Sequence, residues 1–296
     1  MTEFYLLHIF ALTLGQVSSL HFMKRYQLAA GTSLRSNIIY MVINGIISAI
    51  IPLMVLIFGG NKLEYTPYSL LIAFLIVILA ALDCILRFKA YEAGQIATVA
   101  IISTLGSIIL SCLWGVLILN EKVSIRQIIG ILIMLISVLT VSQTHEGKLR
   151  RRLIWIYAVI SVAGAFVSIL SKQHQVETTF ETVDTLSFSV WIGLIRAVVF
   201  LLIAIFPITK QGAKIFKVSR KEAVNATVSS VFSGTSYILT LFTSTVLPIV
   251  ITSPLGVGFG ILMGAFIPWV FYRERLTTRQ LIGVALSLVG TMLFLW

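Results

Sequence analysis

Ten apolar stretches, each long enough to cross a lipid bilayer as a helix, dominate this sequence of 296 residues. A helix needs about 20 apolar residues to span the hydrocarbon core. The stretches cover residues 4–22, 38–58, 68–90, 95–119, 125–143, 153–171, 185–207, 223–245, 247–271 and 277–296. The longest connections, 144–152, 172–184 and 208–222, leave no room for a soluble domain. We therefore expect an all-α membrane protein with ten transmembrane helices.

The composition supports this fold class and excludes a nucleic-acid-binding protein. Charged residues make up only 11% of the chain, whereas a soluble domain has roughly 25%. The net charge of +11 comes from Lys and Arg in short segments between apolar stretches. Such residues set orientation and contact anionic lipid headgroups. We expect a multi-pass protein of a cell membrane, the bacterial cytoplasmic membrane, whose first helix is retained because no cleavable signal peptide is evident.

No motif for enzyme chemistry is present. Cys84 and Cys112 lie inside apolar stretches and give neither a disulfide framework nor zinc spacing. Metalloprotease, hydrolase and Walker motifs are absent from the sequence. We therefore expect no catalytic residue, metal or cofactor, and any transport to be secondary rather than driven directly by ATP.

A segment of the first half recurs in the second half. Residues 120–130 align with 273–283, 153 positions further on. The aligned pairs are Glu121 with Glu274, Arg126 with Arg279, Gln127 with Gln280 and Gly130 with Gly283. The halves, 1–147 and 148–296, each contain five expected helices, so the second copy must cross the membrane in the opposite sense. Inverted repeats of this kind are typical of transporters, with the substrate at the repeat interface.

The repeated segment also predicts local structure. Ser124 with Gln127, and Thr277 with Gln280, each indicate a capping box at the start of the next helix. Glu121 and Glu274 lie at helix ends, where we expect them to pair with Arg126 and Arg279 in a structural role. Lys24 and Lys172, just past the first helix of each half, are expected to anchor at the membrane interface.

The chain resembles the drug/metabolite transporter superfamily, specifically the EamA type. The resemblance depends on the two Glu-Lys/Arg-x-Ser/Thr-x-Arg-Gln-x-Ile-Gly segments, on Pro254 to Gly256 with its counterpart Thr104 to Gly106, and on the basic residue after the first helix of each half. It covers essentially the whole chain. It implies a carrier of amino acids, drugs, sugars or other small metabolites, mostly outward, with the third, fourth, eighth and ninth helices at the centre.

Two arguments about orientation disagree. Most Lys and Arg residues, including Arg150, Arg151 and Arg152, lie on the side opposite the termini. The positive-inside rule then places both termini outside, whereas the resemblance favours termini inside. We follow the charge distribution, which makes the connection containing Glu177, Glu181 and Asp184 either an outward-facing acidic mouth or an ordinary solvated loop.

Ionisable groups within apolar helices are the first candidates for function, because they are costly there. Asp83 and Arg87 share one face of the third helix and align with Ser233 and Tyr237 in the second half, which breaks the repeat symmetry. They form either a structural ion pair or a substrate site in which Asp83 binds a proton or a cation. Arg196 aligns with Asn44 and either binds a substrate carboxylate or braces the fold.

The ninth helix and the aromatic residues provide further candidates. Pro254 can kink its helix, and Gly256, Gly260 and Gly264 form a small-residue ridge that permits close packing and a flexible wall. The eighth helix is rich in hydroxyl groups. Four aromatic residues are candidates for a cage around a quaternary ammonium group. They are Tyr91, Trp114, Trp191 and Tyr237. His21 and His174 are interpreted as ordinary surface or core residues.

The function predicted from sequence is secondary transport of a small metabolite by alternating access, with export of amino acids or related metabolites favoured and proton coupling open. The alternative substrate is an organic cation, in multidrug efflux or choline-like uptake. A channel or a membrane enzyme is the alternative class. The expected partners are a small-molecule substrate, the lipid bilayer and protons. The sequence leaves open a monomer or a homodimer.

Overall fold

The computed structural model describes residues 2–31, 33–92, 96–142, 154–205, 218–273 and 277–295, which are helical apart from short connections. In chain order the elements are α1 (Thr2–Val17), the π-helical segment η1 (Ser18–Phe22), α2 (Met23–Ala30), α3 (Leu34–Phe58), α4 (Pro67–Glu92), α5 (Ile96–Leu117), α6 (Ile125–Ser142), α7 (Ile154–Val176), α8 (Thr185–Ile205), α9 (Arg220–Ser244), α10 (Ile249–Tyr272) and α11 (Thr278–Leu295). Each of the ten predicted stretches contains a helix in this part of the chain.

The first helix is longer than the sequence predicts. α1 continues without a break through the π-helical turn η1 into α2, so that Thr2–Ala30 form one helical segment. The prediction ended at residue 22, because the polar residues that follow interrupt the apolar run. Hydrogen bonding of the backbone continues through them, and the helix ends only where Gly31 adopts φ +78°, a conformation that favours glycine.

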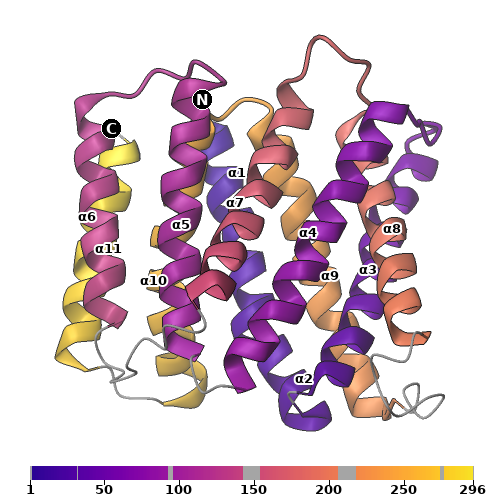
Figure 1. Cartoon of the computed structure of the whole chain (residues 1–296), viewed down its shortest axis with the longest axis horizontal. Helices are drawn as coiled ribbons and strands as arrows, with labels where there is room; N and C mark the ends of the chain where they lie inside the picture. Colours follow the sequence, from indigo (N-terminus) through magenta and orange to yellow (C-terminus); the bar gives the residue numbers. More distant parts are fainter. Residues whose placement is uncertain are drawn as a thin grey trace.

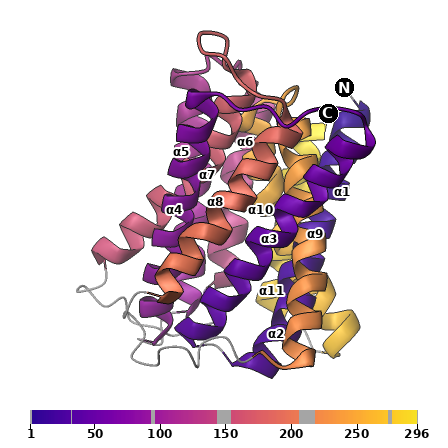
Figure 2. The ribbon, with the colours of Figure 1, turned by 90° about the vertical axis from the view of Figure 1, so that its right-hand side faces the viewer.

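The helices stand side by side in one bundle, with both termini at the same end (Figure 1). The pair α6 and α11 lies at one edge of the long axis, and the pair α3 and α8 lies at the other. The view turned by 90° again shows the two termini together, at the end opposite α2 (Figure 2). We call this the termini end.

Five helical segments in the described part of the chain are long and apolar enough to cross a membrane, judged by length and composition. They are Thr2–Ala30, Leu34–Phe58, Pro67–Leu86, Thr185–Ile205 and Ile249–Phe271. Large apolar side chains also remain exposed on outer faces, such as Phe58 at 83% and Ile125 at 77%. An apolar exterior of this kind is suited to lipid rather than water. The chain is a multi-pass integral membrane protein.

Contacts between the helices join the first half of the chain to the second. The closest associations are α3 with α8 and α6 with α11. In addition, α1 packs on α9 and α10, while α7 packs on α4 and α5. The core therefore forms between the halves as well as within each of them.

Glycine allows α3 and α8 to approach very closely. A Cβ atom built on Gly45 would lie 2.5 Å from the Ala197 backbone nitrogen, and one built on Gly193 would lie 2.6 Å from that of Ala49. Real side chains essentially never come so close, so the two backbones are in contact at this crossing. Gly45 meets Ala197 and Ala49 meets Gly193, so the residue number rises along α3 as it falls along α8. The two helices are therefore antiparallel.

This crossing predicts the effect of one added methyl group. We expect Gly193→Ala to lower the free energy of unfolding by about 1–3 kcal/mol, the usual cost of overpacking. Thermal unfolding of the purified protein in detergent measures the change. Gly164→Ala on α7 is the matched control, because nothing lies within 4 Å of its built Cβ. An equal loss of stability in both variants would contradict the close crossing.

Candidate substrate site

A row of hydrogen-bonded polar side chains links α8 through α3 to α9. Nη1 of Arg196 donates to Oδ1 of Asn44 at 2.7 Å, and Nδ2 of Asn44 donates to Oγ of Ser233 at 2.8 Å. Ser233 in turn donates to the Ser230 carbonyl at 3.3 Å. We call Arg196, Asn44 and Ser233 the polar row. Two of the predicted site residues, Arg196 and Ser233, are thus brought together through Asn44.

Most of the hydrogen-bonding capacity of Arg196 is unused. A guanidinium has five N–H donors, and among the described residues only Asn44 accepts from it. No nitrogen of Arg196 is among the fully buried side-chain atoms that lack a partner, and the residue is only partly buried. The remaining donors therefore face space that water or a substrate can reach. A cation in this position is suited to bind a carboxylate or another anionic group bidentately.

Two tyrosines contribute to the surroundings of Arg196. Tyr237 on α9 and Tyr40 on α3 are the titratable neighbours of the guanidinium, and no described carboxylate is among them. The Tyr237 hydroxyl lies 3.0 Å from Oγ of Ser171, and the Tyr40 hydroxyl lies 2.9 Å from Oγ of Ser229. The hydroxyl-rich face of α9 is thus engaged with α3 and α7.

The predicted aromatic cage is not assembled at a single place among the described residues. Trp191 and Tyr237 pack against the same apolar core cluster between α4, α8 and α9, and Trp191 donates to the Glu64 carbonyl at 2.8 Å. Trp114 packs against a different cluster and lies 3.5 Å from Oε1 of Gln173. The side chain of Tyr91 lies outside the described part of the structure.

Asp83 lies partly buried on α4, the helix expected to hold the ion pair. The side chain of Arg87 lies outside the described part, so pairing between these two residues stays a prediction. The polar row is formed by other helices, α3, α8 and α9.

The predicted glycine ridge of α10 faces α1 over part of its length. The built Cβ of Gly256 meets Leu12 at 3.6 Å and that of Gly260 meets Gln16 at 3.3 Å, whereas nothing lies within 4 Å of that of Gly264. The tightest approach is at Gly258, whose built Cβ would lie 2.6 Å from Oγ1 of Thr291 on α11. The spacing pattern did not single out Gly258, because it lies on the opposite face.

Lys172 is buried in α7 and caps the end of α9. Its Nζ donates to the carbonyl oxygens of Ser244 at 2.6 Å and Leu247 at 2.8 Å, and the residue is only 5% exposed. The predicted role as an interface anchor is therefore wrong for Lys172. The ammonium group satisfies carbonyls that the end of a helix leaves without partners.

Glu121, in the loop between α5 and α6, caps the start of α10, the helix that follows α9. Its carboxylate accepts from the amides of Ile249 at 2.9 Å and Val250 at 3.0 Å. The expected ion pair with Arg126 is replaced by this contact, because a carboxylate gains more from the free amides and positive dipole of a helix N-terminus. Glu121 and Lys172 also attract each other electrostatically. Together they hold residues 245–248, which we call the α9–α10 turn.

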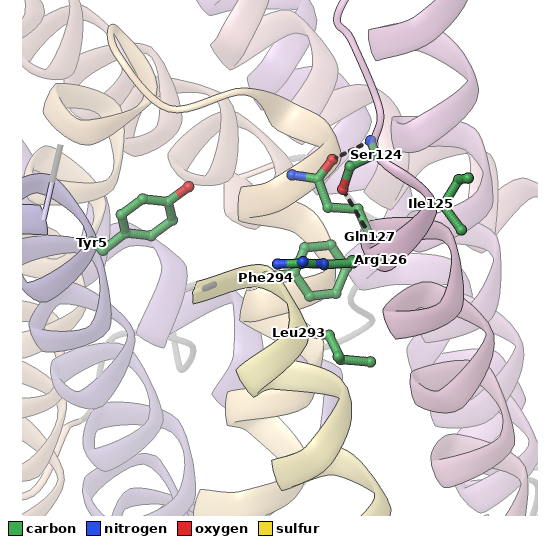
Figure 3. Close-up of a pocket in the computed structure, with 7 residues that line it drawn as sticks. All are labelled: Tyr5, Ser124, Ile125, Arg126, Gln127, Leu293 and Phe294. Atoms are coloured by element: carbon green, nitrogen blue, oxygen red, sulfur yellow. Dashed lines mark hydrogen bonds between the residues drawn. The ribbon is translucent and has the colours of Figure 1, made fainter.

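Both predicted capping boxes are present. Ser124 and Gln127 exchange hydrogen bonds at the start of α6, and Thr277 and Gln280 do the same at the start of α11. Arg126 is exposed and lines a cavity of about 520 Å³ at the termini end, together with Tyr5, Phe294 and neighbouring residues (Figure 3). No residue of the polar row lines this cavity. Glu274 lies outside the described residues.

Two of the three carboxylates of the predicted acidic mouth, those of Glu177 and Asp184, accept hydrogen bonds from backbone amides. α7 continues to Val176, so the connection is shorter than predicted. The Thr179 amide and the Gln173 side chain donate to Glu177, which lowers its pKa to about 2. Oδ1 of Asp184 accepts from two amides at the start of α8. These bonds favour the ordinary structural interpretation of the loop over attraction of cations.

Residues 5–143 match the profile of the EamA-like transporter family. The first half of the chain is thus similar to members of that family. The match confirms the resemblance that the sequence indicated. A transporter, rather than an enzyme, is the function typical of its members.

One solved structure, titled only "Crystal structure of protein", resembles the whole chain. The alignment covers 99% of this chain and 96% of the other, with a TM-score of 0.79 and 13% sequence identity. A likeness at this identity shows a shared fold and nothing about substrate. A search of curated proteins gives no significant match.

The caps on the α9–α10 turn predict a stability effect. Lys172→Met removes the donor of two buried carbonyls, and we expect a loss of about 1–3 kcal/mol for each group left without a partner. Thermal unfolding in detergent measures this loss. Lys122→Met is the control, because Lys122 is exposed in the neighbouring loop. Equal melting temperatures for the two variants would contradict the capping role.

Proposed function

We propose that the chain is a secondary transporter that works by alternating access between two inverted repeats, residues 1–147 and 148–296. The arrangement of helix contacts supports this proposal. Replacing each helix by its counterpart in the other half converts α1 with α9 into α7 with α4, and α1 with α10 into α7 with α5. All four of these helix contacts are present in the structure. The pairs α3 with α8 and α6 with α11 convert into themselves, as they would on a two-fold axis.

The glycine contacts support the same relation at the level of residues. Gly45 against Ala197 becomes Gly193 against Ala49 when 148 positions separate the counterparts. At the other edge, Gly130 approaches the carbonyl of Gly290, and Ser137 donates to that of Gly283 at 2.6 Å. When each residue is replaced by its counterpart 153 positions away, the contact of Gly130 with Gly290 becomes the contact of Gly283 with Ser137. This is the separation found in the sequence. Ten membrane crossings would then place both termini on one side, the outside by the charge distribution.

The substrate that the polar row supports best is a small molecule with an acid group, such as an amino acid or a related metabolite. The observation that favours it is the partly accessible guanidinium of Arg196, which has no described carboxylate partner. At the spacing of the glycine contacts, the counterpart of Arg196 is Ser48 rather than the Asn44 inferred from sequence. The cation therefore has no charged equivalent in the first half, as an asymmetric substrate requires.

The same observation weighs against an organic cation at this place. Arg196 would repel a second positive charge in the same row. The cation alternative depends on Asp83 on α4 and on aromatic residues that lie in two separate clusters. We retain export as the proposed direction, because the resembled family works mostly outward.

A thermal-shift screen with matched variants tests this proposal. A ligand present at about 100 times its Kd stabilises the folded state by about 2.7 kcal/mol. We expect amino acids or small carboxylates to raise the melting temperature of the wild type, and Arg196→Gln to abolish the shift. Arg126→Gln serves as the control, because this exposed arginine lies outside the polar row.

The same screen can also show that the substrate is an organic cation. Stabilisation by organic cations that disappears in Asp83→Asn would establish the cation alternative and refute the carboxylate site. For any ligand found, uptake into proteoliposomes that saturates and shows counterflow identifies a carrier, whereas linear flux without counterflow identifies a channel.

A further inference from the structure

Two histidines are buried to the same extent but differ in their hydrogen bonds. His8 on α1 and His174 on α7 are each 1% exposed. Both ring nitrogens of His174 have partners, since Nε2 lies 2.8 Å from Oγ of Ser69 and Nδ1 lies 3.2 Å from Nε2 of Gln175. His8 has a partner only at Nδ1, which lies 2.8 Å from Oγ1 of Thr243 on α9. Its Nε2 is buried without a partner.

The bond made by Thr243 fixes the tautomer of His8. Thr243 donates its own hydroxyl proton to the Thr240 carbonyl at 3.0 Å. Its oxygen is therefore free to accept, and Nδ1 of His8 must be the donor. Nε2 then has an unprotonated lone pair that no N–H or O–H group reaches. A buried acceptor in this condition costs about 1–3 kcal/mol, and it is a base with room for one proton.

The position of His8 links this base to the α9–α10 turn. Thr243 lies just before the turn, and Thr252 lies one turn into α10, where its backbone carbonyl is the group that a protonated ring would donate to. His8 thus contacts both helices from α1, the first helix of the other half. The opposite side of the same turn is held by Lys172 and Glu121.

No described charged side chain acts on the His8 ring. Its partners are the Thr243 hydroxyl from α9 and the Thr252 carbonyl from α10, and Tyr5 is the titratable neighbour one turn earlier on α1. Glu121 and Lys172 are the charged groups on the turn itself, and they are engaged with backbone and with each other. The Thr252 carbonyl offers the protonated ring one hydrogen bond, but no described carboxylate balances the charge of a buried imidazolium, so the observed contact favours a neutral ring.

We propose that His8 is a proton-binding site that controls contact between α1 and the α9–α10 turn, an inference that rests on the alternating-access function proposed above. The neutral ring holds the termini end closed. Proton binding at Nε2 favours a state in which α1 and the turn separate and the imidazolium is hydrated. Because the open state binds the proton better, its population rises as pH falls. In this proposal the proton is a second ligand of the transporter beside the substrate, and it either couples to transport or regulates it.

Hydrogen–deuterium exchange tests this without any substrate. The protein in nanodiscs is compared at about pH 7.5 and about pH 5.5, the range in which histidine charge changes. After correction for intrinsic amide exchange, we expect several-fold faster exchange at the lower pH in peptides from the first half of α1 and from residues 240–252. His8→Asn, which keeps a donor for Thr243 but cannot titrate, should remove this difference. His8→Gln provides a second variant should His8→Asn fail to fold.

Matched variants decide between the outcomes. His174→Asn should keep the pH response, because both nitrogens of that histidine are already engaged. The proposal is overturned if the wild type shows no pH response, if both His8 variants keep it, or if Asp83→Asn removes it while His8→Asn does not. Loss of ligand binding in Arg196→Gln would refute the substrate site and leave this result unaffected, so the two failures are distinguishable.

Discussion

The requirement that each backbone group and each charge inside an apolar bundle find its partner within the protein governs this structure. Lipid offers no hydrogen bonds, so a helix end that is buried in the bundle needs a donor or an acceptor from the protein. At the α9–α10 turn Lys172 supplies the donor and Glu121 supplies the acceptor. One comes from α7 and the other from the loop after α5, so the turn is fixed by elements that precede it in both halves of the chain.

The surrounding lipid also explains why the bundle depends on glycine at its two edges. Without a hydrophobic difference between side chain and lipid, association of helices in a membrane depends on close packing. Gly45 and Gly193 bring the backbones of α3 and α8 into contact, and Gly130 and Gly290 do so for α6 and α11. These crossings join the first half of the chain to the second, and the α3–α8 pair also carries two of the three residues of the polar row, Asn44 and Arg196.

The sequence predicted an all-helical membrane protein correctly, and it predicted part of the local structure around the site. Apolar length predicted the helices, and local spacing predicted both capping boxes, because these properties depend on residues near one another in the chain. It could not predict that α1 continues through η1 to Ala30, since a π-helical turn has no composition of its own. It also missed the caps formed by Glu121 and Lys172. Their partners are backbone atoms distant in sequence, which no side-chain pattern reveals.

His8 illustrates the limit most clearly. In the sequence it is one histidine within an apolar run, and its burial alone would not separate it from His174. The difference lies in a single ring nitrogen, and it becomes visible only when Thr243 is placed beside it and Thr240 takes the hydroxyl proton. These contacts depend on how α1 packs against α9 and α10. If the halves move as units, the surroundings of the unpartnered nitrogen change, because His8 lies in one half and its neighbours Thr243 and Thr252 lie in the other.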